Sequence, residues 1–294
     1  MSAQRILQPI RNRPLVAAGA ITAIGMSVWV TKSCLVRDVH AESPSQQPPK
    51  VFSGFGGQSL RLESSNLVNH NTKRLRFEFP NSEAQSGLTL TSSVLTIAWP
   101  QGRWFPVLRP YTPISSIDEP GSLELLVKRY PNGKASGYLH SLTPGSTLLM
   151  VGLGGYKWIP NSFPHVTLIA GGAGITPIYQ LTRGILRNPD DRTRITLVHG
   201  INTDADLLLR EEFEDLERRF PGRFRWVVTV SKPVEGSPFR RGYVNKELLE
   251  EVGSGKRSEE KVFVCGPPPM ETALTAKRGV LEELGYRKDQ IVKF

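Results

Sequence analysis

The chain has 294 residues, of which 39% are hydrophobic and 22% are charged, and its formal net charge is +10. This length is enough for two ordinary domains with buried cores, and the composition is that of a globular protein. The two cysteines, Cys34 and Cys265, form no CxxC pair, which excludes a disulfide framework and argues against a structural zinc site. No zinc-finger spacing and no basic block with interleaved aromatics occurs, so we do not expect nucleic-acid binding or a metal site.

Residues 1–37 carry five basic residues and no acidic one, so +5 of the +10 remains for the rest of the chain. Residues 15–30 form an uncharged run, slightly shorter than the roughly 20 residues that cross a bilayer core. We interpret residues 1–37 as a mitochondrial presequence with a short membrane anchor. A secretory signal is the first alternative, disfavoured by the cysteine-poor body, and an unstructured tail is the second, disfavoured by the uncharged run. Residues 38–50 are polar and Pro-rich and are interpreted as a linker.

Residues 51–160 are predicted to form a β domain. Apolar and polar residues alternate as in half-buried strands, and Gly and Pro separate the runs. The predicted strands are residues 58–64, 73–79, 122–127 and 146–151, and residues 134–142 can hold a short helix. Many short strands at regular spacing favour an antiparallel barrel.

Two segments of this domain are unlike ordinary turns. In residues 109–115, Arg109, Tyr111 and Thr112 lie between or beside prolines that stiffen the backbone. Such a segment can hold an aromatic face and a hydroxyl against a flat ring while the guanidinium meets a phosphate, or it can be a plain edge strand. In residues 130–136, a Gly turn leads into a short helix, which suits either a pyrophosphate or a simple connection.

Residues 161–294 are predicted to form an α/β domain with a mostly parallel sheet. The predicted strands are residues 166–170, 195–198, 225–230, 261–265 and 290–294. We expect Thr176 to cap a helix that has Pro177 at its first position and ends near Arg187. Thr203 or Asp204 is expected to cap a helix that continues to Arg219. Further helices are expected at residues 245–252 and from Cys265 through Leu284.

Two turns lie at the carboxyl ends of these strands, where ligands of α/β sheets bind. Residues 171–177 (Gly-Gly-Ala-Gly-Ile-Thr-Pro) open a helix and can hold a diphosphate on free N–H groups, although they are not a full G-x-G-x-x-G fingerprint. Residues 265–270 (Cys-Gly-Pro-Pro-Pro-Met) form a rigid loop that can place a thiol at the floor of a pocket. Alternatively, Cys265 is a small buried residue.

These motifs together resemble the ferredoxin–NADP reductase superfamily, and especially the fungal mitochondrial NADH–cytochrome b5 reductases. The resemblance covers roughly residues 51–294 and rests on Arg-Pro-Tyr-Thr-Pro at 109–113, Gly-Lys-Ala-Ser at 133–136 and the turns at 171–177 and 265–270, in that order. It implies an antiparallel FAD-binding β-barrel followed by a Rossmann-like, parallel-sheet NAD-binding domain, with an N-terminal membrane segment. Ala135 and Gly137 depart from the family's usual residues.

The resemblance also implies which residues act. FAD would be bound by Arg109, Pro110, Tyr111, Thr112, Lys128, Tyr130, Gly133, Lys134, Ala135 and Ser136. The nicotinamide nucleotide would be bound by Gly172, Gly174, Thr176, Pro177, Cys265, Gly266, Pro267 and Met270, with Phe294 near the flavin. Thr112, Thr176 and Cys265 would be closest to the chemistry.

Asp206 matches an acidic position that the family associates with NADH, because a carboxylate accepts a hydrogen bond from a ribose 2′-hydroxyl and repels a 2′-phosphate. Alternatively, Asp206 is an acid favoured by the first turn of a helix. The implied reaction is hydride transfer from NADH to FAD and single-electron transfer to cytochrome b5 or a similar acidic haem protein. A monomer attached to the mitochondrial outer membrane is expected, or one in the intermembrane space if the anchor is cleaved.

Two other functions stay open at this point. One is a reductase of the same superfamily that serves a quinone or another one-electron acceptor. The other is an inactive membrane scaffold with this fold. The intact segments at 109–112 and 171–177 argue against the scaffold.

Overall fold

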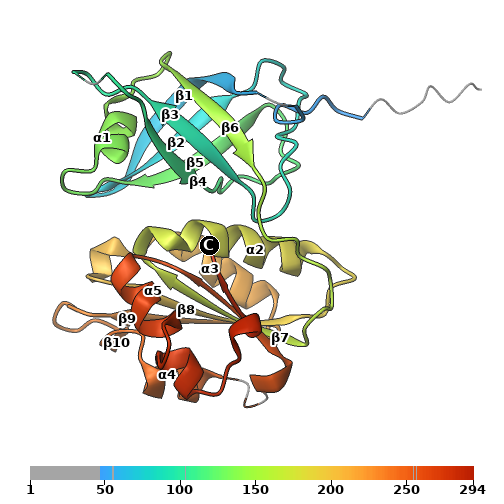
Figure 1. Ribbon diagram of the computed structural model, residues 1–294, viewed down its shortest axis with the longest axis vertical. Coiled ribbons are helices and arrows are strands. Elements are labelled where there is room, and N and C mark those ends of the chain that lie inside the picture. Colours follow the sequence, from blue (N-terminus) through green and yellow to red (C-terminus); the bar gives the residue numbers. More distant parts are fainter. Residues whose placement is uncertain (1–46, 55, 103, 254, 256) are drawn as a thin grey trace, which may run out of the picture. The chain divides into compact units, whose positions relative to one another are not determined.

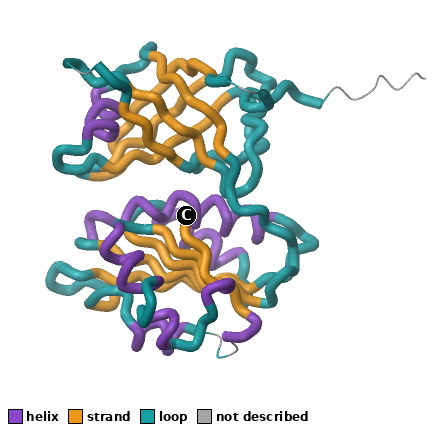
Figure 2. The backbone as a smooth tube through the Cα atoms, in the orientation of Figure 1, coloured by secondary structure: helices purple, strands orange, loops and turns teal. Residues whose placement is uncertain are grey.

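The computed structural model describes residues 47–294 except 55, 103, 254 and 256. The predictions for residues 1–37, including the run 15–30, and for most of the linker lie outside the described residues. Within the described part, no helix is long and apolar enough to cross a membrane. The described chain contains two six-stranded sheets, which are traced in Figures 1 and 2.

The first sheet has the order β4-β3-β6-β1-β2-β5, and each neighbouring pair is antiparallel, as predicted. Its strands are β1 Gln58–Asn69, β2 Thr72–Glu78, β3 Ser93–Ala98, β4 Val107–Tyr111, β5 Ser122–Lys128 and β6 Thr147–Leu153. The helix α1, Lys134–Ser141, follows β5 where a short helix was expected. Alternate side chains of these strands form one buried core, which includes Leu62, Leu75, Phe77, Leu125 and Met150.

The two outer strands of this sheet are joined by the segment that follows β4, not by a strand ladder. The Ile114 N–H donates to the Glu124 carbonyl at 2.8 Å, and the Glu124 N–H donates to the Ser115 hydroxyl at 3.0 Å. This contact turns the open edge of β4 toward β5. Residues 107–111 are therefore at an edge, where Pro110 can be accommodated without the loss of a ladder bond.

The second sheet has the order β10-β9-β8-β7-β11-β12, and its ladders are parallel, as predicted. Its strands are β7 His165–Gly171, β8 Arg194–Ile201, β9 Phe224–Val230, β10 Arg240–Arg241, β11 Glu260–Cys265 and β12 Ile291–Lys293. Helices α2 Ile175–Arg187, α3 Arg210–Arg219, α4 Lys246–Val252, α5 Pro268–Thr275 and α6 Val280–Glu283 flank the strands (Figure 2). The strand order reverses direction at β7, next to β11, which is the point where such sheets bind ligands.

The predicted helix starts need correction at two places. A 3₁₀ turn, Gly172–Gly174, precedes α2, so Gly174 is the N-cap and Thr176 and Pro177 already lie in the first turn. Thr203 caps the 3₁₀ turn Asp204–Asp206, and α3 begins only at Arg210, after Leu209 with φ +58°. In both places a 3₁₀ turn at the strand end precedes the α-helix, so the predicted capping residue is not the N-cap of that helix.

The region after β11 also differs from the prediction of one helix. It is divided into α5 and α6, with the break after Thr275. Pro268 and Pro269 occupy the first two positions of α5, where the missing N–H groups have no intrahelical partner in any case. The three prolines therefore start a helix rather than form a long loop.

The connection between the two sheets is fixed by one buried carboxylate, Asp191. Its oxygens accept hydrogen bonds from Trp158 Nε1 at 2.8 Å, from the Asn161 N–H at 3.3 Å and from the Thr193 N–H at 3.0 Å. Burial alone would raise the pKa of the Asp191 carboxyl, but these donors hold that pKa below its usual value. The connecting segment is thereby held against the second domain. The start of β7, which follows this segment, is held in place with it.

We expect Asp191→Ala to lower the free energy of unfolding by about 2–4 kcal/mol, because it leaves buried N–H donors without an acceptor. The neighbouring substitution Asp190→Ala removes an exposed carboxylate and is the control, with an expected change within about 0.5 kcal/mol. Urea unfolding followed by tryptophan fluorescence measures both. Equal effects of the two substitutions would contradict the anchoring role of Asp191.

Candidate functional site

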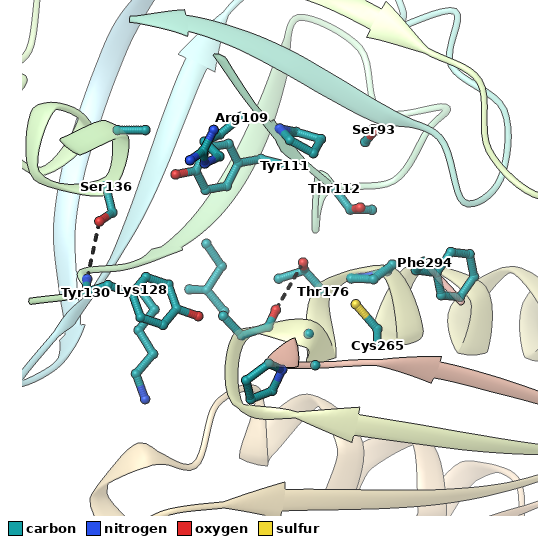
Figure 3. A pocket seen from close by; sticks show the side chains of 18 of the residues that line it. Ser93, Arg109, Tyr111, Thr112, Lys128, Tyr130, Ser136, Thr176, Cys265 and Phe294 are labelled. Carbon is teal, nitrogen blue, oxygen red and sulfur yellow. Dashed lines mark hydrogen bonds between the residues drawn. The ribbon is translucent and has the colours of Figure 1, made fainter. Parts of the chain in front are cut away.

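One large pocket brings the motifs of both domains together, with a volume of about 1420 Å³. Ligand pockets for one drug-sized molecule are typically about 300–1,000 Å³, so this pocket has room for more than one such group. Its first-domain wall comes from β4, β5 and the start of α1, and its second-domain wall comes from the turns after β7 and β11. Figure 3 shows Arg109, Tyr111 and Thr112 on one side and Thr176, Cys265 and Phe294 on the other.

The end of β4 supplies a cation, a phenol and a hydroxyl. The Arg109 guanidinium donates to the Leu108 carbonyl at 2.7 Å, and within the described residues no carboxylate pairs with it. Burial, and then the nearby Tyr130, raise the pKa of Tyr111 to about 12, against the opposing effect of Arg109. Tyr111 is therefore a neutral hydrogen-bonding aromatic at physiological pH, and Arg109 keeps N–H donors available for a phosphate.

The start of α1 forms a second set of donors for an anion. The Ser136 hydroxyl accepts from the Tyr130 N–H and donates to the Gly133 carbonyl, both at 3.2 Å. A Cβ at Gly133 would lie 2.4 Å from the Ser136 Oγ, so this turn requires glycine. The first N–H groups of an α-helix have no intrahelical acceptor, and together with the Lys134 ammonium they suit a pyrophosphate.

The turns after β7 and β11 form the opposite wall. Thr176 donates to the Ala173 carbonyl at 3.4 Å, which holds the Gly-rich turn in shape (Figure 3). Burial first, and Glu271 second, raise the pKa of the Cys265 thiol to about 12. The thiol therefore stays protonated and is a small neutral surface rather than a nucleophile.

Phe294 completes the pocket next to these turns. Its ring stacks on Phe263 with 5.7 Å between the ring centroids, and its N–H donates to the Val264 carbonyl at 3.1 Å. The side chain is therefore held by the core of the second sheet while it lines the pocket. Phe294 therefore lines the pocket, and its expected place near a bound flavin stays a prediction.

Of the residues expected to bind cofactors, only Gly172, Asp206 and Met270 do not line the pocket. Met270 lies behind the wall, because a Cβ at Gly171 would be 2.7 Å from its sulfur. The structure adds lining residues that sequence reasoning missed: Thr91, Ser93, Pro106, Val107, Leu108, Leu126, Asn132, Gly154, Gly155, Tyr156, Gly171, Ala173, Pro268, Val292 and Lys293. The period-two spacing of Leu126, Lys128 and Tyr130 is a signal that could have revealed Leu126.

Comparison with known proteins agrees with this geometry. Residues 59–157 match the oxidoreductase FAD-binding domain, and residues 168–276 match the oxidoreductase NAD-binding domain. The chain is 44% identical over 295 residues to NADH-cytochrome b5 reductase 2 of Emericella nidulans, covering 96% of this chain and 90% of that protein. It is 45% identical over 251 residues to the protein of the same name from Pyricularia oryzae, covering 81% and 76%.

The chain belongs to the NADH–cytochrome b5 reductase family. Among solved structures, the cytochrome b5 reductase domain of Ulva prolifera nitrate reductase is similar, with a TM-score of 0.74 and 28% identity over 84% of this chain and 100% of that one. The family resemblance and the expected FAD-binding and NAD-binding domains are thereby confirmed. The donors around Arg109 and Lys134, the glycine-dependent turns and the pocket volume all fit two nucleotide cofactors.

Asp206 does not lie where a residue that accepts a hydrogen bond from a ribose 2′-hydroxyl is expected. Its side chain is buried, and its Oδ1 accepts from the Lys128 ammonium at 2.6 Å. Its Oδ2 accepts from the Thr203 N–H at 3.1 Å and from the Thr203 hydroxyl at 2.8 Å. Both carboxylate oxygens are therefore occupied by protein donors.

The same carboxylate joins the two domains. Asn71, from the β1–β2 hairpin, donates to Asp206 Oδ1 at 3.3 Å, and Asn69 of that hairpin donates to the Ala205 carbonyl at 2.9 Å. Burial would raise the pKa of Asp206, but Lys128, Thr203 and Asn71 together lower it to about 2. The ion pair fixes Lys128 at the pocket wall and holds the hairpin against the 3₁₀ turn.

We expect Asp206→Asn to lower the free energy of unfolding by about 2 kcal/mol near pH 7. The folded-state pKa is about 2, below the ordinary 3.8, so this stabilisation is present above about pH 4 and is lost as the pH falls toward 2. The difference between wild type and variant should therefore shrink at about pH 3, as measured by urea unfolding.

Glu211→Gln, which removes an exposed acid near the start of α3, is the matched control and should change stability little at either pH. A double-mutant cycle with Lys128→Met tests the pairing itself. Additive effects of the two substitutions would show that Asp206 and Lys128 are not coupled.

Proposed function

We propose that the protein is an NADH-dependent flavoprotein reductase that passes electrons to cytochrome b5. The observation that carries this proposal is the pocket in which Arg109 and Tyr111 of β4 face Thr176 and Cys265 at the turns after β7 and β11 (Figure 3). The curated relatives named above bear this activity in their name. The cofactor supplies the conversion between a two-electron donor and a one-electron acceptor.

The chain's own residues bind the two cofactors and orient them. Arg109 and the start of α1 bind the phosphates of FAD, and Tyr111 lies against its ring. Thr112 offers a hydroxyl on the first-domain side, opposite Thr176 and Cys265 (Figure 3), and these two residues would form the surface that receives the nicotinamide. Hydride and electron transfer require no acid–base group of the protein, and Tyr111 and Cys265 stay neutral at physiological pH.

A one-electron haem acceptor is favoured over a quinone by charge. Outside residues 1–37 the chain carries +5, which suits a transient encounter with an acidic protein. Reduction of cytochrome b5 should therefore slow as ionic strength rises. A quinone acceptor would show little dependence on salt.

The purified full chain in detergent tests the proposal. With FAD bound and oxygen removed, NADH should bleach the flavin absorbance, and added cytochrome b5 should then be reduced. Thr112→Val, which deletes one hydroxyl, should slow bleaching about 10-fold or more, while Thr112→Ser should retain the rate. Bleaching by NADPH but not by NADH would contradict the proposed donor. Reduction of a quinone but not of cytochrome b5 would contradict the proposed acceptor.

We also propose that residues 15–30 anchor a monomer to the mitochondrial outer membrane. The basic, acid-free segment 1–37 and the uncharged run within it support this proposal. The tagged protein should resist carbonate extraction from mitochondria and should lose this resistance when residues 1–37 are deleted. Recovery of a shortened form from the intermembrane space would show cleavage instead.

A further inference from the structure

Two neighbouring aromatic side chains in the loop between β3 and β4 are almost uncovered. Trp104 is 95% exposed and Phe105 is 79% exposed, the highest values among the large hydrophobic residues described. Trp99, at the start of the same loop, and Leu108, in β4 just after it, are 50% and 42% exposed. Single exposed apolar residues are ordinary, but an uncovered aromatic group in one loop indicates a binding surface.

This loop borders a hollow of its own. A cavity of about 590 Å³ is lined by Pro100, Gln101, Gly102, Trp104, Phe105 and Lys134. Lys134 also lines the large pocket, as does Pro106, the residue that follows Phe105. The second cavity therefore adjoins the large pocket at the start of α1.

We propose that Trp104 and Phe105 wall the subsite for the adenine ring of FAD, an inference that rests on the proposed function. The flavin ring is assigned to the Tyr111 end of the pocket, and the pyrophosphate to the start of α1. The adenosine half of FAD must then extend beyond the pyrophosphate. The second cavity meets the large pocket at Lys134 and offers two aromatic faces there.

The chemistry of the loop suits an adenine ring. Every base has a flat π-face, and stacking on an aromatic side chain is sequence-tolerant and favourable. The Lys134 ammonium, which lines the same cavity, can meet the phosphate to which the adenosine is attached. A bound adenine would cover the aromatic surface that is otherwise left in water.

Insertion of the loop into a lipid surface is the other use that exposed Trp and Phe side chains suggest. The observations favour adenine, because the two rings border a hollow and that hollow adjoins the cofactor pocket. Insertion into lipid would not require the loop to border a cavity that is also lined by a phosphate-binding lysine.

The test compares FAD with FMN, which has the same flavin ring but no adenosine. In the flavin-free full chain in detergent, Trp104→Ala should weaken FAD binding roughly 10- to 100-fold and leave FMN binding within about twofold. Trp104→Phe should restore most of the FAD affinity. Trp99→Ala is the matched control, since Trp99 lies in the same loop but lines neither cavity, and it should preserve both affinities.

Three results would overturn the inference. Trp104→Ala could leave FAD binding unchanged, or it could weaken FAD and FMN equally. Brominated phosphatidylcholine–phosphatidylserine vesicles could also quench the tryptophan fluorescence of the FAD-loaded wild type more than that of Trp104→Phe, which would identify a lipid-binding loop. A wild-type chain that binds neither flavin would instead refute the proposed function itself.

Discussion

The site depends on the close backbone contact between the turns that end β7 and β11. A Cβ at Gly174 would lie 2.3 Å from the Cys265 carbonyl oxygen, and a Cβ at Gly266 would lie 3.2 Å from the Gly171 nitrogen. A side chain at Gly174 would meet the backbone, so glycine is required there, and one at Gly266 would need the neighbouring backbone to move by a few tenths of an ångström. Because β7 and β11 are paired in parallel, this contact turns two distant motifs into one continuous wall. The remaining functional groups are arranged around that wall.

The electrostatics of the pocket separate binding from chemistry. Cations that can bind phosphate, Arg109 and Lys134, lie on the first-domain side, and the groups nearest the assigned ring positions are neutral. Burial keeps the Tyr111 phenol and the Cys265 thiol protonated, so neither brings a charge next to a bound flavin. A third cation, Lys128, is already neutralised by Asp206. This distribution suits a protein that orients two cofactors and leaves the electron chemistry to them.

Much of this architecture could be predicted from the sequence, because nine of the twelve described strands show a recognisable pattern of apolar residues, whereas β3 and β10 were not predicted and β4 was given only as an alternative. β3 was missed for a physical reason: Thr96 faces the core while Leu95 and Ile97 are only half-buried, which reverses the expected pattern. The prediction of helix N-caps failed where a 3₁₀ turn precedes the α-helix, because Thr203 can cap either kind of helix. Most residues of the family motifs line the pocket. They could not show that Asp206 is enclosed by Thr203 and Lys128, because Lys128 comes from a strand in the other domain.

The pairing of Lys128 with Asp206 links cofactor binding to the association of the two domains. Lys128 lines the pocket while its ammonium contacts a turn of the second domain, and the hairpin at Asn69 and Asn71 contacts the same turn. From α2, Arg183 donates to the Ile114 carbonyl at 2.6 Å, only two residues beyond Thr112. Thr112 and Thr176 are thus set opposite each other by polar contacts on both sides of the pocket. Because ligands that bind only the folded arrangement stabilise it, FAD and NADH bound between these contacts would strengthen the same interface that positions them.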